Sequence, residues 1–330
     1  MRPSEIAEHA RRAERLGYDG LNLPEAVHDG LLLSSLALQA TTRLHVATSV
    51  LVAFTRSPMT TAVAAWDLQA YSGGRFELGL GAQVRGNVED RYGVPWSPPI
   101  GRMREYVGAL RAICACWQDG AKLAFEGEHY RLTRMQPFFA PEPLEVDPVP
   151  ICLGAVGPQM TTLAGEVADG LVTHPTNTHP RYLREVIRPR LARGAERAGR
   201  QADRLSLHVA PICVAGPDEA TVAARREETR KMFAFLYSTP AYWPSLELFG
   251  WGERGKALHG LTRENRWDDL GDVVDDEMLD ALVPSGTYAT LPKRLREMYD
   301  GLADTLVFPM PDDPSEDADA AAAIATLRRA

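Results

Sequence analysis

Short continuous apolar runs alternate with longer segments of helical periodicity along almost the whole chain. The apolar runs predict seven strands, near residues 18–24, 43–52, 75–82, 149–154, 169–174, 205–215 and 303–309. Runs without a polar face are typical of strands buried on both sides in a parallel sheet. Strand–helix alternation of this kind indicates the α/β class. An open doubly wound sheet can hold seven strands, whereas a closed (β/α)8 barrel needs eight.

Two segments interrupt the alternation. Residues 119–148 predict a short hairpin followed by a Pro-rich loop, and residues 231–286 form an aromatic-rich insertion with several short helices. The tail over 312–330 is acidic and then Ala-rich, which predicts a peripheral helix. Because no repeat and no long linker appears, we expect a single domain over residues 1–330.

The composition and net charge of the chain limit the kinds of partner that it can bind. The chain has 330 residues, of which 45% are hydrophobic and 24% charged, and its net charge of −8 argues against nucleic acid or an anionic membrane surface. No apolar run reaches the roughly 18 residues of a membrane span, and the N-terminal segment is an amphipathic helix rather than a signal peptide. We therefore expect a cytoplasmic protein that acts on a small molecule. No cluster of His, Cys or acidic residues predicts a metal site.

The stretch PICLGAVGPQM, residues 150–160, combines a strand, a tight turn with Gly154 and Gly157, and the start of a helix. Backbone N–H groups at a helix N-terminus bind anions. The G-x-x-G spacing matches neither a dinucleotide fingerprint nor a P-loop. Two interpretations remain open: a phosphate cradle, or an ordinary turn that uses glycine for its positive φ.

Several segments between residues 11 and 309 carry a family resemblance. The most specific are SGGRFELGLG and LGAVGPQM…LAGEVADG. With them, the chain resembles the bacterial-luciferase-like superfamily of flavin- and deazaflavin-dependent oxidoreductases, and within it the branch that uses coenzyme F420. The resemblance implies a luciferase-like TIM barrel.

The first strand of that barrel is missing here, because only three residues precede the helix expected over 4–16. We therefore expect seven strands with a gap between the first and the last. Either the native N-terminus starts upstream, or the barrel is open.

The resemblance also implies a cofactor site at the carboxyl ends of the strands. The loop after the fifth barrel strand is expected to bind the cofactor's phosphate. The residues implied there are Gly154, Ala155, Val156 and Gly157, whose backbone lies close to the phosphate, and Gln159 and Met160, which open the helix.

Two further loops are implied to contact the cofactor's ring system. Ser49 and Val50 are expected to be joined by a non-proline cis peptide bond that packs against the ring. After the strand at 75–82, the residues implied at the ring edge or the ribityl chain are Gly81, Ala82, Gln83 and Arg85. Relatives that oxidise sugar phosphates carry a carboxylate at the position of Ala82, so this alanine argues against such a substrate.

Two histidines follow predicted strands. The resemblance implies that His28 faces the cofactor or substrate as a proton donor; the alternative is a loop histidine bonded to backbone. Glu25 and Asp29 flank it, and either could orient the imidazole or be solvated. His174 is expected to contact cofactor or substrate, with a capping histidine before Pro175 as the alternative.

Together these features predict an oxidoreductase that transfers a hydride between F420 and an unidentified small organic substrate. The alternatives are a reduced-FMN-dependent monooxygenase of the luciferase type, fed by a separate flavin reductase, and a catalytically inactive flavin-binding barrel. We also expect a homodimer. The aromatic insertion suggests an apolar substrate or a buried subunit interface.

Overall fold

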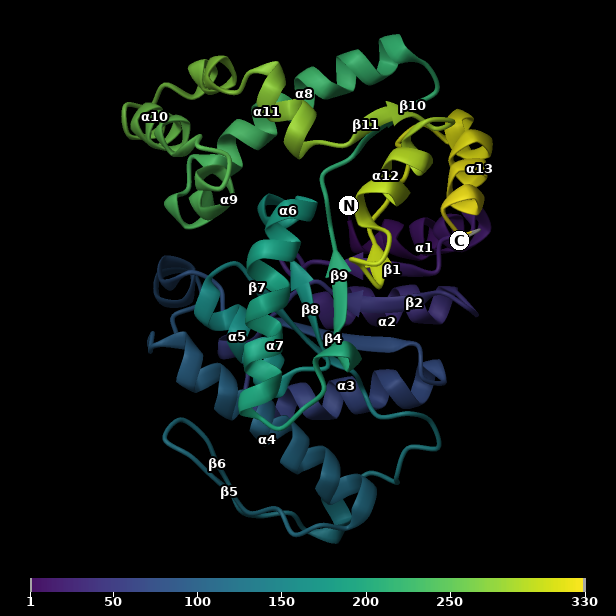
Figure 1. Cartoon of the computed structure of the whole chain (residues 1–330). Coiled ribbons are helices and arrows are strands. Elements are labelled where there is room, and N and C mark those ends of the chain that lie inside the picture. The colour runs from purple at the N-terminus through teal and green to yellow at the C-terminus, as the bar shows by residue number, and fades with distance from the viewer. Residues whose placement is uncertain (1, 329–330) are drawn as a thin grey trace. The chain divides into compact units, whose positions relative to one another are not determined.

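The computed structural model describes residues 2–328, and its main sheet contains seven parallel strands (Figure 1). Their order is β1-β2-β4-β7-β8-β9-β12, with the short β3 (Leu51–Val52) beside β4. The bounds are β1 Gly20–Leu23, β2 His45–Thr48, β4 Phe76–Gly81, β7 Ile151–Ala155, β8 Gly170–Thr173, β9 Ser206–Val209 and β12 Thr305–Leu306. This is the strand order of a TIM barrel with one strand missing. Within the described chain β1 and β12 end the order, so the expected seven strands and the gap are confirmed.

Helices connect the strands, and several begin at caps that the sequence encodes. Asp29 accepts hydrogen bonds from the N–H groups of Leu31 and Leu32 at the start of α2, and Ser57 does the same for Thr60 in α3. The connecting helices are α1 Ile6–Leu16, α2 Gly30–Ala40, α3 Pro58–Ser72, α4 Pro99–Asp119, α5 Pro158–Val167, α6 Pro180–Tyr182 and α7 Arg188–Arg197. α12 (Leu291–Tyr299) precedes β12, and α13 (Asp317–Arg328) forms the helix expected in the tail.

The described chain divides into two compact units. The first contains the chain up to Ala155 together with Gln159–Leu171 and Leu191–Leu205. The second contains Val156–Pro158, Val172–Arg190 and the chain from Ser206 onward. Each unit has its own buried side chains and is described by itself.

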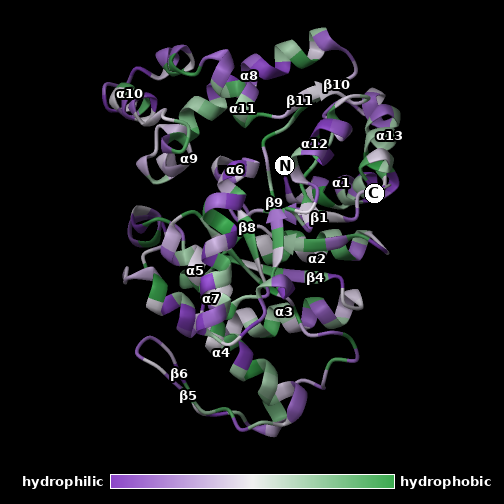
Figure 2. Cartoon of the chain, viewed as in Figure 1, coloured by the Kyte–Doolittle hydropathy of each residue, from purple (hydrophilic) through white to green (hydrophobic). Residues whose placement is uncertain are grey.

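In the first unit, strands and helices share an apolar core. Val46 and Leu78 from the sheet are 1% exposed, and Leu38 from α2 is equally buried. α2 has no charged residue, and Figure 2 shows it as predominantly hydrophobic. The hairpin expected within 119–148 is present as the antiparallel pair β5 (Phe125–Glu126) and β6 (Arg131–Leu132). Burial of these faces positions the carboxyl ends of β1 to β7.

The strand expected over 205–215 is two separate strands, so this expectation was wrong. β9 stays in the main sheet, whereas β10 (Val214–Gly216) pairs in parallel with β11 (Ser285–Thr287) in a small second sheet. Pro211 lies between β9 and β10, and a proline has no N–H to donate to a strand ladder. The chain therefore leaves the main sheet at this point.

The second unit contains a helical core built mostly by the aromatic-rich segment. Its helices are α8 Glu219–Tyr237, α9 Trp243–Glu247, α10 Gly252–Arg263 and α11 Asp276–Leu282. Phe233, Tyr237, Leu246, Leu258 and Met278 are at most 1% exposed and pack in one cluster. Phe233 and Tyr237 therefore belong to a hydrophobic core, whereas Phe235 and Trp267 of the same segment are exposed. None of the helices in the described part of the chain is long and apolar enough to cross a membrane.

Candidate functional site

Val50 lies against two glycines at the carboxyl ends of β4 and β7. A Cβ at Gly81 would collide with the Val50 side chain, and a Cβ at Gly154 would lie 2.9 Å from Val50 Cγ1. Three residues that the sequence analysis singled out thus meet in the first unit. The bond between Ser49 and Val50 is a non-proline cis peptide, as the resemblance implied. We call Val50, Gly81 and Gly154 the glycine platform.

Thr48 fixes the backbone beside this platform. Its hydroxyl donates to the Gly79 carbonyl at 2.8 Å and accepts from the Gly79 N–H at 3.0 Å. A Cβ at Gly79 would overlap the Thr48 carbonyl, so only glycine allows this approach. Positions 81 and 154 contribute no side chain beside the methyl groups of Val50. An apolar surface of this kind suits the face of a planar ring.

The loop after β4 holds the next group of candidates. Ala82 is half-buried, and Gln83 has a φ of 60° while its Oε1 accepts from the Val84 N–H. The Arg85 guanidinium is exposed, pairs with Glu89 at 2.8 Å and lies over the Trp96 ring. The positive charge of Arg85 is therefore compensated locally.

The turn after β7 differs from the ordinary turn considered above. Neither Gly154 nor Gly157 has a positive φ, so the turn does not need glycine for that reason. A Cβ at Gly157 would meet no atom within 4 Å, and the Val156 carbonyl accepts from the Asn177 amide at 3.3 Å. Ala155 is buried at the end of β7. Met160 is 9% exposed in α5, whereas Gln159 is exposed.

Arg56 fixes the loop that carries His28. Arg56 Nη2 lies 2.5 Å from Glu25 Oε1 and 2.6 Å from Asp29 Oδ2. Glu25 also accepts from the Val52 N–H at 2.7 Å. Burial raises the pKa of Asp29, but its hydrogen bonds from Leu32 and Arg56 outweigh this effect and the net shift is downward. Both flanking carboxylates are thus engaged with Arg56 rather than with the imidazole.

His28 itself is half-buried and has no hydrogen-bond partner among residues 2–328. Arg91 donates to the carbonyl of Ala26, which anchors the loop at a further point. An imidazole without a partner on an anchored loop is available to a ligand. The alternative of a histidine bonded to backbone is not what the structure contains.

His174 lies in the second unit, directly after β8. Its Nδ1 accepts from the Thr176 N–H at 3.4 Å and lies 2.8 Å from Thr176 Oγ1. The capping role considered above is therefore present, at the start of the short 3-10 turn Pro175–Asn177. The His174 ring also stacks on Tyr242, with ring centroids 4.3 Å apart and an interplanar angle of 11°. Burial lowers the pKa of His174 to about 4.

Tyr237 links this region to the helical core. Its hydroxyl donates to the Thr176 carbonyl at 3.1 Å and lies 3.0 Å from Ser245 Oγ. The Ser245 hydroxyl reaches both this oxygen and the Tyr242 carbonyl, and its single proton serves one of them at a time. The contacts therefore tie Tyr242 and Thr176, which both touch His174, to one buried tyrosine.

The low pKa of His174 predicts a pH effect on stability. As pH falls from 6.5 towards 4, the unfolded chain binds a proton at His174 that the folded protein does not bind. The free energy of unfolding should therefore decrease through this window, and His174→Gln should remove that part of the decrease. Urea unfolding of both proteins over this pH range checks the prediction. Identical slopes against pH would contradict it.

The Tyr237 hydroxyl is predicted to stabilise the second unit. Tyr237→Phe leaves the buried Thr176 carbonyl without this donor, and we expect the free energy of unfolding to drop by about 1–2 kcal/mol. Tyr182→Phe is the matched control, because the Tyr182 hydroxyl makes no hydrogen bond within the described chain. Urea unfolding compares the two. A larger loss in the Tyr182 variant would contradict the assigned role.

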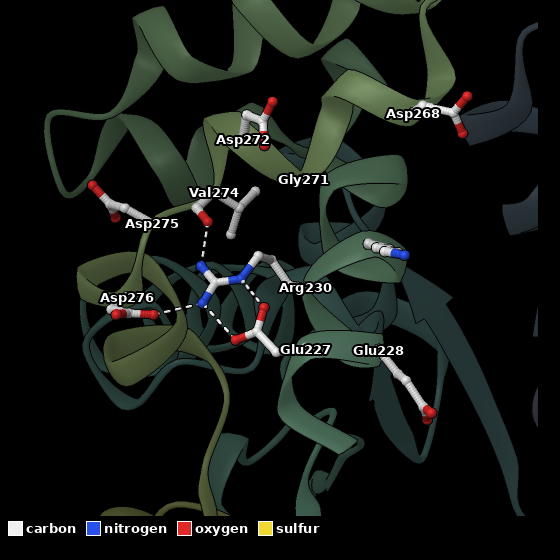
Figure 3. Close-up of a pocket in the computed structure, with 10 residues that line it drawn as sticks. Glu227, Glu228, Arg230, Asp268, Gly271, Asp272, Val274, Asp275 and Asp276 are labelled. Carbon is white, nitrogen blue, oxygen red and sulfur yellow. Dashed lines mark hydrogen bonds and ion pairs between the residues drawn. The ribbon is translucent and has the colours of Figure 1, made fainter. Parts of the chain in front are cut away.

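A hollow of about 550 Å³ lies in the second unit, and none of its lining residues is a candidate from the sequence (Figure 3). Arg230 bonds to Glu227, Asp276 and the Val274 carbonyl there, as Figure 3 shows. Six acidic residues surround only two basic ones; the full lining is Glu227, Glu228, Arg230, Lys231, Asp268, Gly271, Asp272, Val274, Asp275 and Asp276. This excess of negative charge repels an anionic cofactor.

Sequence reasoning missed three side chains of these sites: Arg56, Thr176 and Tyr242. Arg56 follows a strand–turn segment without a recognisable motif, and Thr176 follows the expected capping histidine. Tyr242 is one of many aromatic residues in the insertion. The composition of the insertion indicated an apolar segment, but it did not indicate the contact between Tyr242 and His174.

The comparisons with known proteins match almost the whole chain. The family model described as luciferase-like monooxygenase matches residues 1–305. An uncharacterized protein of Mycobacterium tuberculosis is 45% identical over 309 residues, covering 92% of this chain and 90% of that protein. The 5,10-methylenetetrahydromethanopterin reductase of Methanolobus tindarius is 28% identical, with 94% and 92% covered.

Among solved structures, the coenzyme F420-dependent tetrahydromethanopterin reductase from Methanopyrus kandleri shares the fold with a TM-score of 0.79. It is 22% identical to this chain, and the match covers 99% of this chain and 94% of that one.

Proposed function

Because the chain belongs to the luciferase-like monooxygenase family, we propose that it is an oxidoreductase that transfers a hydride between coenzyme F420 and a small organic substrate. The observation that carries this function is the glycine platform, where a Cβ at Gly81 or Gly154 would come too close to the Val50 side chain. Relatives named as reductases of methylenetetrahydromethanopterin and a neighbour named as F420-dependent support the choice of F420.

The residues of the platform fit a deazaflavin. The methyl groups of Val50 offer an apolar contact to one face of a planar ring, and the absence of side chains at Gly81 and Gly154 leaves room for those methyl groups. Bound F420 would supply the carbon that accepts or donates the hydride. His28, whose imidazole has no protein partner within the described chain, would hold or release the proton that balances the reaction on the substrate.

The remaining candidate residues keep the roles that the resemblance implied. We assign the ring edge or ribityl chain to Ser49, Ala82, Gln83 and Arg85. We assign the phosphate to the backbone of Ala155, Val156 and Gly157 and to the start of α5, which Gln159 and Met160 open. α5 has ten residues, long enough for its N-terminal N–H groups to attract an anion. His174 is assigned to the cofactor or the substrate.

Cofactor binding tests this function directly. Fluorescence titration of the purified protein should give a lower Kd for F420 than for FMN. Tight FMN binding with oxygen-dependent product formation would instead support the monooxygenase, which needs a separate flavin reductase. Binding of F420 without any turnover of a carbonyl panel would support an inactive barrel.

We also propose a homodimer. The outward face of α2 carries the 53% exposed Leu32 and the partly buried Leu36 beside the exposed Gln39, and this helix has no charged residue. An apolar helix face is more often covered than exposed. Light scattering of the eluting protein measures the oligomeric state.

A further inference from the structure

Glu25 joins the loop that carries His28 to the segment that carries Val50. The Glu25 N–H donates to the Val50 carbonyl at 3.4 Å, and the Glu25 carboxylate accepts from the Val52 N–H at 2.7 Å. The two bonds reach one three-residue stretch, the first through the backbone and the second through the side chain. Val52 pairs with Gly81 in the sheet, so this stretch adjoins the glycine platform. The loop of His28 is therefore attached to the platform.

Arg56 holds the Glu25 carboxylate in this position. Its two terminal nitrogens contact the two carboxylate oxygens separately, at 2.9 Å and 2.5 Å, which is the bidentate arrangement of a guanidinium–carboxylate pair. The Glu25 side chain is only 6% exposed, so its negative charge depends on a partner. A lysine ammonium would supply the charge but not the two parallel bonds. The guanidinium therefore fixes the direction of the carboxylate as well as compensating its charge.

The same guanidinium also binds the other end of the loop. Arg56 Nη2 lies 2.6 Å from Asp29 Oδ2. The second Asp29 oxygen accepts from the N–H groups of Leu31 and Leu32 at the start of α2. One arginine thus contacts a carboxylate three residues before His28 and another one residue after it. Because the guanidinium is a rigid planar group, it confines the backbone of His28 between two fixed points.

Arg56 has little capacity left for an anionic ligand. Two carboxylates already face its single positive charge. Its Nη1 and Nη2 atoms carry four hydrogens, and the acceptors around them are the two Glu25 oxygens, Asp29 Oδ2 and Thr55 Oγ1. A phosphate or carboxylate of a ligand would have to displace one of these acceptors. Arg56 therefore acts through the loop and not by binding the cofactor.

We propose that Arg56 and Glu25 are positioning residues, which fix the separation between the His28 imidazole, where the proton is held, and the Val50 methyl groups, where the ring lies. This role rests on the proposed function, because it concerns the same proton and the same ring. The hydride and the proton go to neighbouring atoms of one substrate molecule, so the groups that hold them must keep a constant separation. The contacts of Glu25 provide that separation within the first unit.

Two sets of nuclear magnetic resonance signals report this separation without cofactor or turnover. Labelling the full chain with ¹⁵N-histidine and ¹³C-methyl valine gives the His28 ring and the Val50 methyl groups, assigned by their loss in His28→Ala and Val50→Ala. Arg56→Lys should shift both sets, because the loop and the segment 50–52 share the Glu25 carboxylate. A change confined to His28 would overturn the coupling, and unchanged signals at both residues would overturn the positioning role.

Arg104→Lys is the matched control. Arg104 in α4 pairs at 2.6 Å with Glu166 in α5, whose side chain is 13% exposed, so the same kind of ion pair is changed in the same unit. This pair joins two helices and has no bond to the loop of His28. The control should leave the His28 and Val50 signals in place and keep nearly full turnover.

Kinetics separate positioning from folding and from ligand binding. In Arg56→Lys and Glu25→Gln, kcat for oxidation of reduced F420 with the best substrate of a ketone and aldehyde panel should fall roughly 10- to 100-fold, with KM and the Kd for F420 within about twofold of wild type. Guanidinium ions should restore part of kcat in a folded Arg56→Ala protein, whereas ethylammonium should not. A raised KM at unchanged kcat would mean that Arg56 binds a ligand and would refute the role.

The two kinds of measurement distinguish this role from the proposed function. Failure of F420 to bind the wild-type protein by fluorescence would refute the cofactor assignment, while the His28 and Val50 signals would still show whether Arg56 couples the loop to the platform. Coupled signals together with wild-type kcat in a folded Arg56→Lys protein that binds F420 would refute the positioning role and leave the cofactor assignment intact.

Discussion

Replacing His28 with alanine is expected to lower kcat/KM for F420-dependent turnover by about 10²–10⁴, the usual cost of losing a positioned proton donor. The melting temperature should stay nearly unchanged, because the imidazole makes no hydrogen bond within the described chain and its loop is held by other residues. Glu25 and Asp29 keep their bonds to Arg56 in this variant. Steady-state oxidation of reduced F420, with the best substrate of a ketone and aldehyde panel, gives the rate.

A neighbouring residue provides the control for this variant. Val27 is 85% exposed in the same loop, so Val27→Ala changes the loop surface without removing a proton donor. We expect it to keep nearly full activity. Equal rates for wild type and His28→Ala would remove His28 from the mechanism, and equal losses in both variants would point to the loop surface instead of the imidazole.

Gly157→Val is expected to weaken F420 binding roughly 10- to 100-fold, the loss expected when one or two charge-assisted hydrogen bonds to phosphate are blocked. The substitution should not disturb the fold. A Cβ at this position meets no atom within 4 Å, and Gly157 does not have a positive φ. The added side chain would therefore occupy the space that a phosphate needs beside the turn. Fluorescence titration with F420 gives the Kd.

Gly260→Val is the matched control for Gly157→Val. Gly260 lies in α10, and a Cβ there also meets no atom within 4 Å. The same change in volume at this site should leave the affinity for F420 unaltered, and circular dichroism should show both variants folded. An unchanged Kd in a folded Gly157→Val protein would mean that the turn after β7 is only a connection.

The sequence pattern by itself determined the α/β class of the fold, and the resemblance added the strand order of a barrel. Local apolar runs report burial on both faces of a strand, and their alternation with helices leaves little choice except a parallel sheet. The deficit of one strand was also expected, and the described part of the chain contains seven strands in the main sheet. The resemblance added the cis peptide between Ser49 and Val50, which the structure contains.

Tertiary structure alone decided how the candidate residues are used. The pattern over 205–215 does not reveal that Pro211 diverts the chain into a second sheet. Glu25 and Asp29 flank His28 in sequence, yet both bind Arg56 about thirty residues away. Periodicity carries information on neighbours within a few positions, whereas these bonds join segments that only folding brings together.

His174 shows the same division most clearly. The sequence placed it at the end of a strand and left open whether it caps a turn or contacts a ligand. In the structure Nδ1 contacts Thr176 and caps the turn, so the capping alternative is present. The stack with Tyr242 lies beyond any local pattern, because 68 positions separate the two residues in the chain. Its low pKa arises from burial, a property of the packed molecule rather than of any segment.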